Sequence, residues 1–293
     1  MDDASPSCSP LDTSTLEELM CRLRSGLPDQ QRGGAKEIRR LAKVSSINRI
    51  CIAEAGAVPL LLKSLRSTDK DVQAHCIASL LNLTIRNEGN KQAILSAKGL
   101  DAVVEVLKKG SLQESRENAA ALLFNLSHTT SHRMAVASTD GVFTGLAELL
   151  TDGSARGKKD VAAALFNLLQ IRQCRAIAVR AGVVLPLLQL AQYPSSGLVD
   201  ESLTVLLNLA CHQEGRFAIV QASGIVTLVD LLRRGSDSNK EYACAVLLVL
   251  CHEDYTCSEE ACNLGVQELL ESLSVSGTER AQRKAAKVME LLK

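Results

Sequence analysis

The feature that most constrains the fold of this chain is an internal repeat of 41 to 43 residues. Four asparagines lie in the similar apolar segments LLNL, LFNL, LFNL and LLNL. Six glycines recur in the same phase, and the first four lie 26 residues before an asparagine. The two series are Asn82, Asn125, Asn167 and Asn208, and Gly56, Gly99, Gly141, Gly182, Gly224 and Gly265. A period of this length indicates a repeat architecture.

A third series, of basic residues, shares this phase. Each member lies seven or eight residues before a glycine of the second series. The members are Arg49, Lys91, Arg133, Arg175 and Arg216. Because the three series keep one phase, they predict structurally equivalent units of chain.

Residues 90–131 illustrate one unit. NKQAILSA predicts a short helix with Asn90 as its N-cap, and Gly99 ends that helix in a left-handed turn. LDAVVEVLKK predicts a second helix, which stops at Gly110, and residues 114–128 predict a long, mostly apolar third helix. One such unit cannot bury its own apolar faces, so neighbouring units must stack. The sequence therefore predicts an all-α, right-handed solenoid.

The repeat phase also predicts the organisation of the chain. A polar tail, residues 1–13, precedes six three-helix units and a partial unit whose charged last helix suits a cap. Pro194 should stop the second helix of the fifth unit firmly. The predicted units are 14–55, 56–98, 99–140, 141–181, 182–223, 224–264 and 265–293.

Composition excludes several classes of function. Lys plus Arg equals Asp plus Glu at 33 each, and Trp is absent, so we expect no nucleic-acid partner. No apolar run reaches 18 residues and the N-terminus does not resemble a signal sequence, so we expect no membrane insertion and a cytoplasmic or nuclear location. The ten cysteines include no CxxC pair, and most lie in apolar helical runs, as Cys76, Cys211, Cys244 and Cys251 do. This pattern predicts packed thiols rather than a metal site.

The sequence offers no constellation for catalysis. A Gly-rich phosphate loop, an HExxH motif and a strand–turn–helix setting for a nucleophile are all missing from it. The five histidines lack carboxylates at a spacing that would suit a proton relay. We therefore expect a non-enzymatic, monomeric protein that takes neither a cofactor nor a small-molecule substrate and that binds a protein or an extended peptide.

Several stretches resemble armadillo repeats, and more narrowly the armadillo region of plant U-box ubiquitin ligases. They include AEAGAVPLLLKSLRSTDKDVQAHCIASLLNL, QESRENAAALLFNLS, GKKDVAAALFNL and SGTERAQRKAAKVMELL. The resemblance implies that the repeats select partners, whereas a separate U-box recruits the ubiquitin-conjugating enzyme. Only 13 residues precede the first predicted unit, fewer than the ~50 of a small domain. We therefore expect ligase activity only if a U-box is lost from this chain or is supplied by a partner.

The resemblance also implies a role for the asparagines. In armadillo proteins the third helices line a concave groove, and repeated asparagines there bind the backbone of an extended peptide. A carboxamide suits this task because it offers one acceptor and two donors. The alternative is that each asparagine bonds backbone in its own or a neighbouring repeat and serves stability alone. Import receptors carry Trp one turn earlier, where this chain has Ala78, Ala121, Ala163 and Thr204, so we do not expect a receptor for basic import signals.

The same register predicts a polarity of charge along the groove. Arg40 occupies the asparagine position of the first unit, and Arg32 and Lys36 precede it by two turns and one turn. Acidic residues lie seven or eight positions before the later asparagine positions, namely Asp160, Asp200, Glu201 and Glu241. The alternative is that these are ordinary solvated helix ends. Val249 and Glu290 replace asparagine in the last two units, so backbone binding should fade after Asn208.

Overall fold

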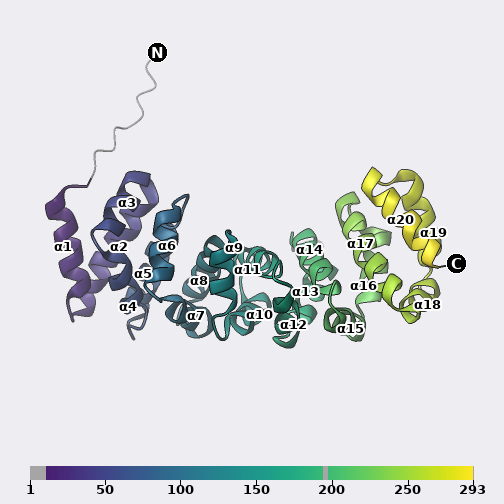
Figure 1. Cartoon of the computed structure of the whole chain (residues 1–293), viewed down its shortest axis with the longest axis horizontal. Helices are drawn as coiled ribbons and strands as arrows, with labels where there is room; N and C mark the ends of the chain where they lie inside the picture. Colours follow the sequence, from purple (N-terminus) through teal and green to yellow (C-terminus); the bar gives the residue numbers. More distant parts are fainter. Residues whose placement is uncertain (1–10, 194–196, 293) are drawn as a thin grey trace, which may run out of the picture. The chain divides into compact units, whose positions relative to one another are not determined.

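The computed structural model describes residues 11–193 and 197–292, which form twenty α-helices and no strand (Figure 1). The predicted all-α class is therefore confirmed for this part of the chain. Pro194 and residues 1–10 of the predicted tail lie outside the described residues.

Three kinds of helix follow one another along the chain: first helices of eight or nine residues, second helices of eight to twelve and third helices of twelve to seventeen. The first helices are α3 (Ser46–Glu54), α6 (Glu88–Ser96), α9 (Thr130–Ala137), α12 (Arg172–Arg180), α15 (Gln213–Gln221) and α18 (Tyr255–Asn263). The second helices are α1 (Thr13–Arg24), α4 (Ala57–Ser64), α7 (Leu100–Lys109), α10 (Val142–Asp152), α13 (Val184–Gln192), α16 (Gly224–Arg234) and α19 (Val266–Ser276). The third helices are α2 (Pro28–Val44), α5 (Lys70–Leu83), α8 (Gln113–Leu126), α11 (Ala155–Leu168), α14 (Val199–Ala210), α17 (Asp237–Glu253) and α20 (Glu279–Leu291).

The chain divides into two compact units, Met1–Gly145 and Leu146–Lys293. In the N-terminal unit α2 packs against α5 and α5 against α8, and in the C-terminal unit α11, α14, α17 and α20 pack in the same consecutive way. The third helices carry the core of each unit, because side chains such as Ile38, Leu80, Leu122, Leu206 and Leu247 are completely buried on them. Stacking of neighbouring repeats thus buries what one repeat could not.

The glycine series has two different physical causes. Gly56, Gly182 and Gly265 adopt the left-handed conformation, with φ of 83°, 86° and 76°, which favours glycine over other residues. The predicted left-handed turn at Gly99 is wrong, because its φ is −92° and Lys98 adopts φ 51° instead. Glycine at position 99 serves close packing, since a Cβ there would lie 2.4 Å from the methyl carbons of Leu62.

Four of the five basic residues of the series cap the ends of third helices, whereas Lys91 pairs with Glu88 in its own helix (2.6 Å). Arg49 donates to the carbonyl of Ala42 (3.0 Å), near the end of α2, and Arg175 donates to that of Leu169 (3.1 Å), just after α11. Arg133 and Arg216 make equivalent bonds to the carbonyls of Ser127 and Ala210. A guanidinium at this position satisfies a carbonyl that has no partner in the helix and complements the negative end of the helix dipole.

Asn90 is not the N-cap that the sequence predicts. The cap of α6 is Asn87, whose side chain accepts the backbone N–H of Asn90. Asn90 is itself buried and donates to the carbonyls of Arg49 and Leu83, both at 2.9 Å. Its carboxamide therefore joins α6 to the preceding first helix and to the end of α5.

Candidate functional site

The four asparagines of the repeat lie near the ends of third helices, and all four are half-buried. In the N-terminal unit their amide groups bind the preceding repeat. The Nδ2 atom of Asn82 donates to the carbonyl of Arg39 on α2 (3.0 Å). The Nδ2 atom of Asn125 donates to Oγ1 of Thr84, the buried C-cap of α5 (3.0 Å). These two asparagines tie one repeat to the next.

Asn208, in the C-terminal unit, behaves differently. Its Nδ2 atom donates to the carbonyl of Thr204 (3.0 Å), one turn earlier in the same helix. Asn167 is half-buried like the others and also has an interaction partner. The asparagine position therefore links repeats in one unit, whereas at Asn208 it makes only a local bond.

The orientation of these carboxamides follows from their partners. A backbone carbonyl only accepts, so nitrogen and not oxygen must face Arg39 and Thr204. The hydroxyl of Thr84 already donates to the carbonyl of Leu81 (2.6 Å), so it accepts from Asn125. Within the described residues, the Oδ1 atoms of Asn82, Asn125 and Asn208 accept no hydrogen bond, and none is a buried atom lacking a partner. These three oxygens are open to solvent.

The basic residues predicted at the N-terminal end separate into two groups. The guanidinium of Arg32 contacts Asp69 at the N-terminus of α5 (2.5 Å). It also contacts Asp29 in its own helix α2 (3.0 Å). The contact between Arg32 and Asp69, together with backbone N–H donors, holds the pKa of Asp69 below its usual range. Lys36 and Arg40 line a common hollow, in which Arg40 pairs with Glu37 (2.6 Å).

The acidic residues predicted along the later third helices have partners within the protein, and most of these partners belong to adjacent repeats. Asp200 accepts from Ser238 (2.7 Å) and Asn239 (2.6 Å) at the start of α17. Glu201 pairs with Lys159 on α11 (3.2 Å). The other two are Glu241, which contacts Thr278 and Lys284, and Asp160, which lies 3.8 Å from Arg156. Asp200 and Glu241 therefore join adjacent repeats.

A hollow between α2 and α5 in the N-terminal unit is strongly charged. Its volume is about 440 Å³. Its cationic lining residues are Arg22, Lys36, Arg39, Arg40 and Lys43, and Glu37 and His75 also line it. We call it the basic hollow.

Three of these cations and the histidine lie outside the positions predicted from the asparagine register. Arg22 lies on α1, and His75 lies seven residues before Asn82 on α5. Arg39 and Lys43 follow Lys36 by three and seven residues, so helical periodicity could have found both.

A second hollow, of about 400 Å³, lies between α17 and α20. It contains Val249 and Glu290, the two residues that replace asparagine in the last repeats, together with Leu248 and Leu291. Three of its seven lining side chains are aliphatic and the other four are ionisable, so it offers a ligand apolar and charged contacts where the earlier third helices offer carboxamides.

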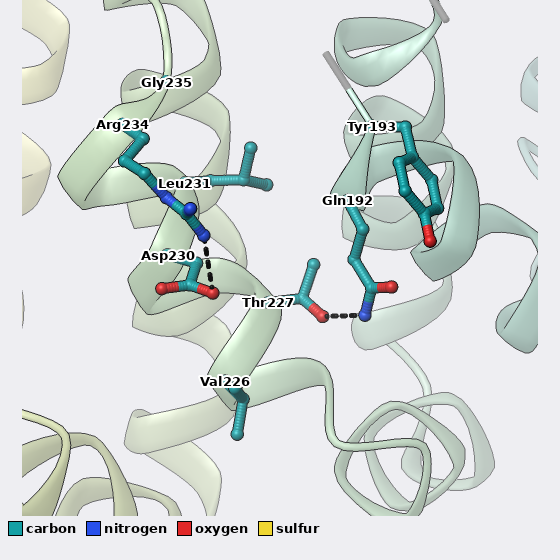
Figure 2. A pocket seen from close by; sticks show the side chains of 8 residues that line it. All are labelled: Gln192, Tyr193, Val226, Thr227, Asp230, Leu231, Arg234 and Gly235. Carbon is teal, nitrogen blue, oxygen red and sulfur yellow. Dashed lines mark hydrogen bonds and ion pairs between the residues drawn. The ribbon is translucent and has the colours of Figure 1, made fainter. Parts of the chain in front are cut away.

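A third hollow lies between the second helices α13 and α16 and has a volume of about 370 Å³ (Figure 2). Its polar groups are satisfied by one another, because Gln192 donates to Thr227 (3.0 Å) and Arg234 pairs with Asp230 (3.0 Å). Figure 2 shows the Arg234–Asp230 pair on α16, the Gln192–Thr227 bond between α13 and α16, and Tyr193 beside Gln192. This arrangement presents no converging set of unpaired groups.

Within residues 11–193 and 197–292, no group of three or more His, Cys, Asp or Glu side chains is arranged to hold a metal ion. Cys76 and Cys244 are completely buried, and burial raises the pKa of each thiol to about 12. Cys211 differs from the predicted packed thiols because it is exposed. No single described helix has the length and apolarity needed to cross a membrane, although two sharply bent helix pairs meet those criteria together.

The sequence matches the family model of the plant U-box protein ARM repeat region over residues 14–293. The U-box domain-containing protein 12 of Oryza sativa subsp. japonica is 44% identical over 291 residues, which cover 99% of this chain and 47% of that protein. The U-box domain-containing protein 14 of Arabidopsis thaliana is 44% identical over 98% of this chain and 45% of its own length. This chain thus spans less than half the length of these two relatives.

Solved structures share the fold. An engineered protein superposes with a TM-score of 0.77 at 26% identity, over 95% of this chain and 68% of its own. A designed armadillo repeat protein, solved in complex with the peptide (KR)4, has a TM-score of 0.68 at 20% identity over 80% of this chain and 99% of its own. At this identity the second likeness establishes the fold alone, which is an all-α solenoid of armadillo repeats.

Proposed function

Because this chain belongs to the plant U-box protein ARM repeat family, we propose that it is a non-catalytic scaffold that binds a partner protein or an extended peptide along its third helices. The scaffold function follows from the family, whose repeats are interaction modules. The use of the third helices and the role of the asparagines are proposals of their own.

The observation that carries this proposal is the set of open carboxamide oxygens. Asn82, Asn125 and Asn208 direct Nδ2 to partners inside the protein and leave Oδ1 open to solvent. A half-buried asparagine whose amide is fixed holds its acceptor in one orientation without further loss of entropy on binding. Such an oxygen accepts a peptide N–H regardless of the side chain that the peptide residue carries.

This geometry refines the expected chemistry. The sequence alone suggests that each carboxamide both donates to a peptide and accepts from it. One N–H of each Nδ2 is engaged inside the protein, so each of these three asparagines keeps its oxygen as an acceptor and its second N–H as a donor. The complex of a designed armadillo protein with the peptide (KR)4 supports a peptide as ligand for this fold.

We propose, as the finer context, that this scaffold selects a protein for ubiquitin transfer. The relatives matched over the ARM region are plant U-box domain-containing proteins, and they are more than twice as long as the matched segment. In this proposal a U-box, elsewhere in the same protein or in a partner, supplies the contact with the conjugating enzyme. The setting would be the cytoplasm or the nucleus.

Asn208 offers the clearest test, because its amide does not link repeats. Peptides selected from a displayed random library on the full chain should bind Asn208→Ala more weakly. One lost hydrogen bond, of about 0.5–1.5 kcal/mol, corresponds to a roughly two- to tenfold loss of affinity. Fluorescence anisotropy with the selected peptides measures this loss.

The matched control is Asn263→Ala, which removes an exposed asparagine from the first helix α18. It should leave the affinity of every selected peptide unchanged. Selected peptides that bind Asn208→Ala and Asn263→Ala as tightly as the unmodified chain would show that the asparagine oxygens do not hold ligand.

A further inference from the structure

The basic hollow contains more positive charge than the carboxylates among the described residues neutralise. Three of its five cations have one carboxylate partner each within the N-terminal unit. Arg22 pairs with Glu18, Arg39 with Glu114 (2.7 Å) and Arg40 with Glu37 (2.6 Å). Among the described residues, Lys36 and Lys43 have no carboxylate within 4.0 Å, and both are exposed. Two positive charges are therefore left without a partner.

These two lysines share one face of α2. They lie seven residues apart, which is two turns, and Arg39 and Arg40 lie between them. Arg32 lies one turn before Lys36, but its charge is paired with Asp29 and Asp69. The unpaired charge is thus concentrated at one hollow rather than distributed along the helix.

His75 gives an independent sign of the local charge. It lines the hollow from α5, and its Nδ1 atom is buried without a hydrogen-bond partner among the described residues. Burial lowers its pKa, and the positive charges of Arg39 and Lys36 lower it further, against the opposite effect of Asp71 and Glu114. The wall of the hollow therefore lies in a region where cations already repel another positive charge.

The basic hollow also adjoins Asn82, the asparagine of α5. His75 lies two turns before Asn82 on the same face of α5, and the amide of Asn82 bonds the carbonyl of Arg39, which lines the hollow. A peptide whose N–H bonds Oδ1 of Asn82 would place a neighbouring side chain near the lysines.

We propose that the basic hollow between α2 and α5 is a docking site for an acidic peptide segment that brings two negative charges to Lys36 and Lys43. Either two adjacent carboxylates or one phosphorylated side chain supplies that charge. This inference rests on the proposed use of the third helices for peptide binding. It names the chemical class of segment that the N-terminal unit selects.

The test uses the full chain and three fluorescent peptides of equal length. One carries consecutive glutamates, one a single phosphoserine, and one glutamines at the same positions. We expect the first two to bind at low ionic strength and the glutamine peptide to bind at least about tenfold more weakly. Preference between the first two peptides distinguishes the carboxylate source from the phosphate source.

The decisive variant is Lys36→Gln/Lys43→Gln, because both side chains are exposed and their loss leaves the core intact. We expect about tenfold weaker binding of the acidic peptides at ~50 mM salt, shrinking to less than about threefold at ~500 mM. The matched control is Lys70→Gln/Lys109→Gln, which removes two exposed lysines of the same unit outside the hollow. It should bind like the unmodified chain.

Histidine NMR locates the bound charge. A negative group in the hollow stabilises the imidazolium of His75, so the pKa of His75 should rise when the glutamate peptide binds. Equal losses in the two lysine variants, or a His75 pKa that stays constant on binding, would overturn the docking site. Equal binding of the glutamine and glutamate peptides would also overturn it, but would leave the third-helix proposal standing.

Discussion

The two compact units use different chemistry at equivalent positions of the repeat. In the N-terminal unit, Asn90 of the first helix α6 donates to the carbonyl of Leu83 at the end of α5. In the C-terminal unit, the corresponding residue before the basic series is Gly215, and a Cβ there would lie 2.0 Å from the carbonyl oxygen of Leu209. The repeat with Asn90 joins its first helix to the preceding third helix with a carboxamide, and the repeat with Gly215 does so by close backbone approach.

The asparagines at the ends of the third helices show a similar difference. Asn82 and Asn125 bond the preceding repeat, whereas Asn208 bonds its own helix. In the C-terminal unit Asp200 and Glu241, near the starts of third helices, also accept from the next repeat. A residue that recurs at one position of a repeat therefore need not keep one task, because the partner across the interface changes.

The largest effect should come from Gly215→Ala. The new Cβ would collide with backbone atoms of Leu209, which cannot rotate away as a side chain can. We expect a loss of about 3 kcal/mol in the free energy of unfolding. Urea denaturation followed by circular dichroism measures it.

The control is Gly89→Ala in the equivalent first helix α6, where the nearest atom to a Cβ is a side-chain oxygen at 3.4 Å. Alanine is the better helix former, so stability there should be unchanged or slightly raised. Equal changes in the free energy of unfolding for Gly215→Ala and Gly89→Ala would contradict the role of close backbone approach at Gly215.

Asn90→Ala should have the next largest effect on the free energy of unfolding. It leaves the carbonyls of Arg49 and Leu83 without their donor in a buried site, at a cost of about 2 kcal/mol. Hydrogen exchange read by mass spectrometry should show faster exchange in α6 and at the end of α5. If exchange accelerates uniformly along the chain instead, Asn90 does not act as a local link.

A smaller effect concerns pH. Because burial and nearby cations lower the pKa of His75 in the folded protein, the unfolded chain binds more protons near pH 6. This histidine therefore lowers stability as pH falls through about 6.5, the ordinary pKa of histidine. At the equivalent position, seven residues before the asparagine, the C-terminal unit has Asp160 and Glu201.

The measurement is the difference between wild-type and His75→Gln melting temperatures at pH 7.5 and pH 5.5. At pH 5.5 the melting temperature of His75→Gln, relative to that of the wild type, should be higher than it is at pH 7.5. A difference in melting temperature that is the same at both pH values would mean that protonation of His75 does not destabilise the fold.

The sequence predicts the helices well because their signals are local. Apolar spacing and the break at Gly110 place α7 at Leu100–Lys109, the ten residues expected for it. The predicted third helix at residues 114–128 also corresponds to α8, Gln113–Leu126, within two residues at each end. The conformation at Gly99 could not be predicted, since it depends on how closely Leu62 of another helix approaches.

The candidate site is less predictable, because partners decide what a polar side chain does. The sequence places Arg32, Lys36 and Arg40 on one helix face but does not reveal that Asp69 of the next repeat binds Arg32. It equally cannot reveal that Asn239 reaches back to Asp200. Both contacts cross between repeats, where spacing within one helix carries no information.

The most direct test of this account compares Asn82→Ala with Asn208→Ala in urea unfolding of the full chain. Asn82→Ala should lower the free energy of unfolding by about 1 kcal/mol, because the carbonyl of Arg39 loses its donor across the repeat boundary. Asn208→Ala should change it by less than about 0.5 kcal/mol, since Thr204 keeps its place in the helix and alanine favours that helix. Equal losses, or a larger loss at Asn208, would contradict the division of tasks between the two units.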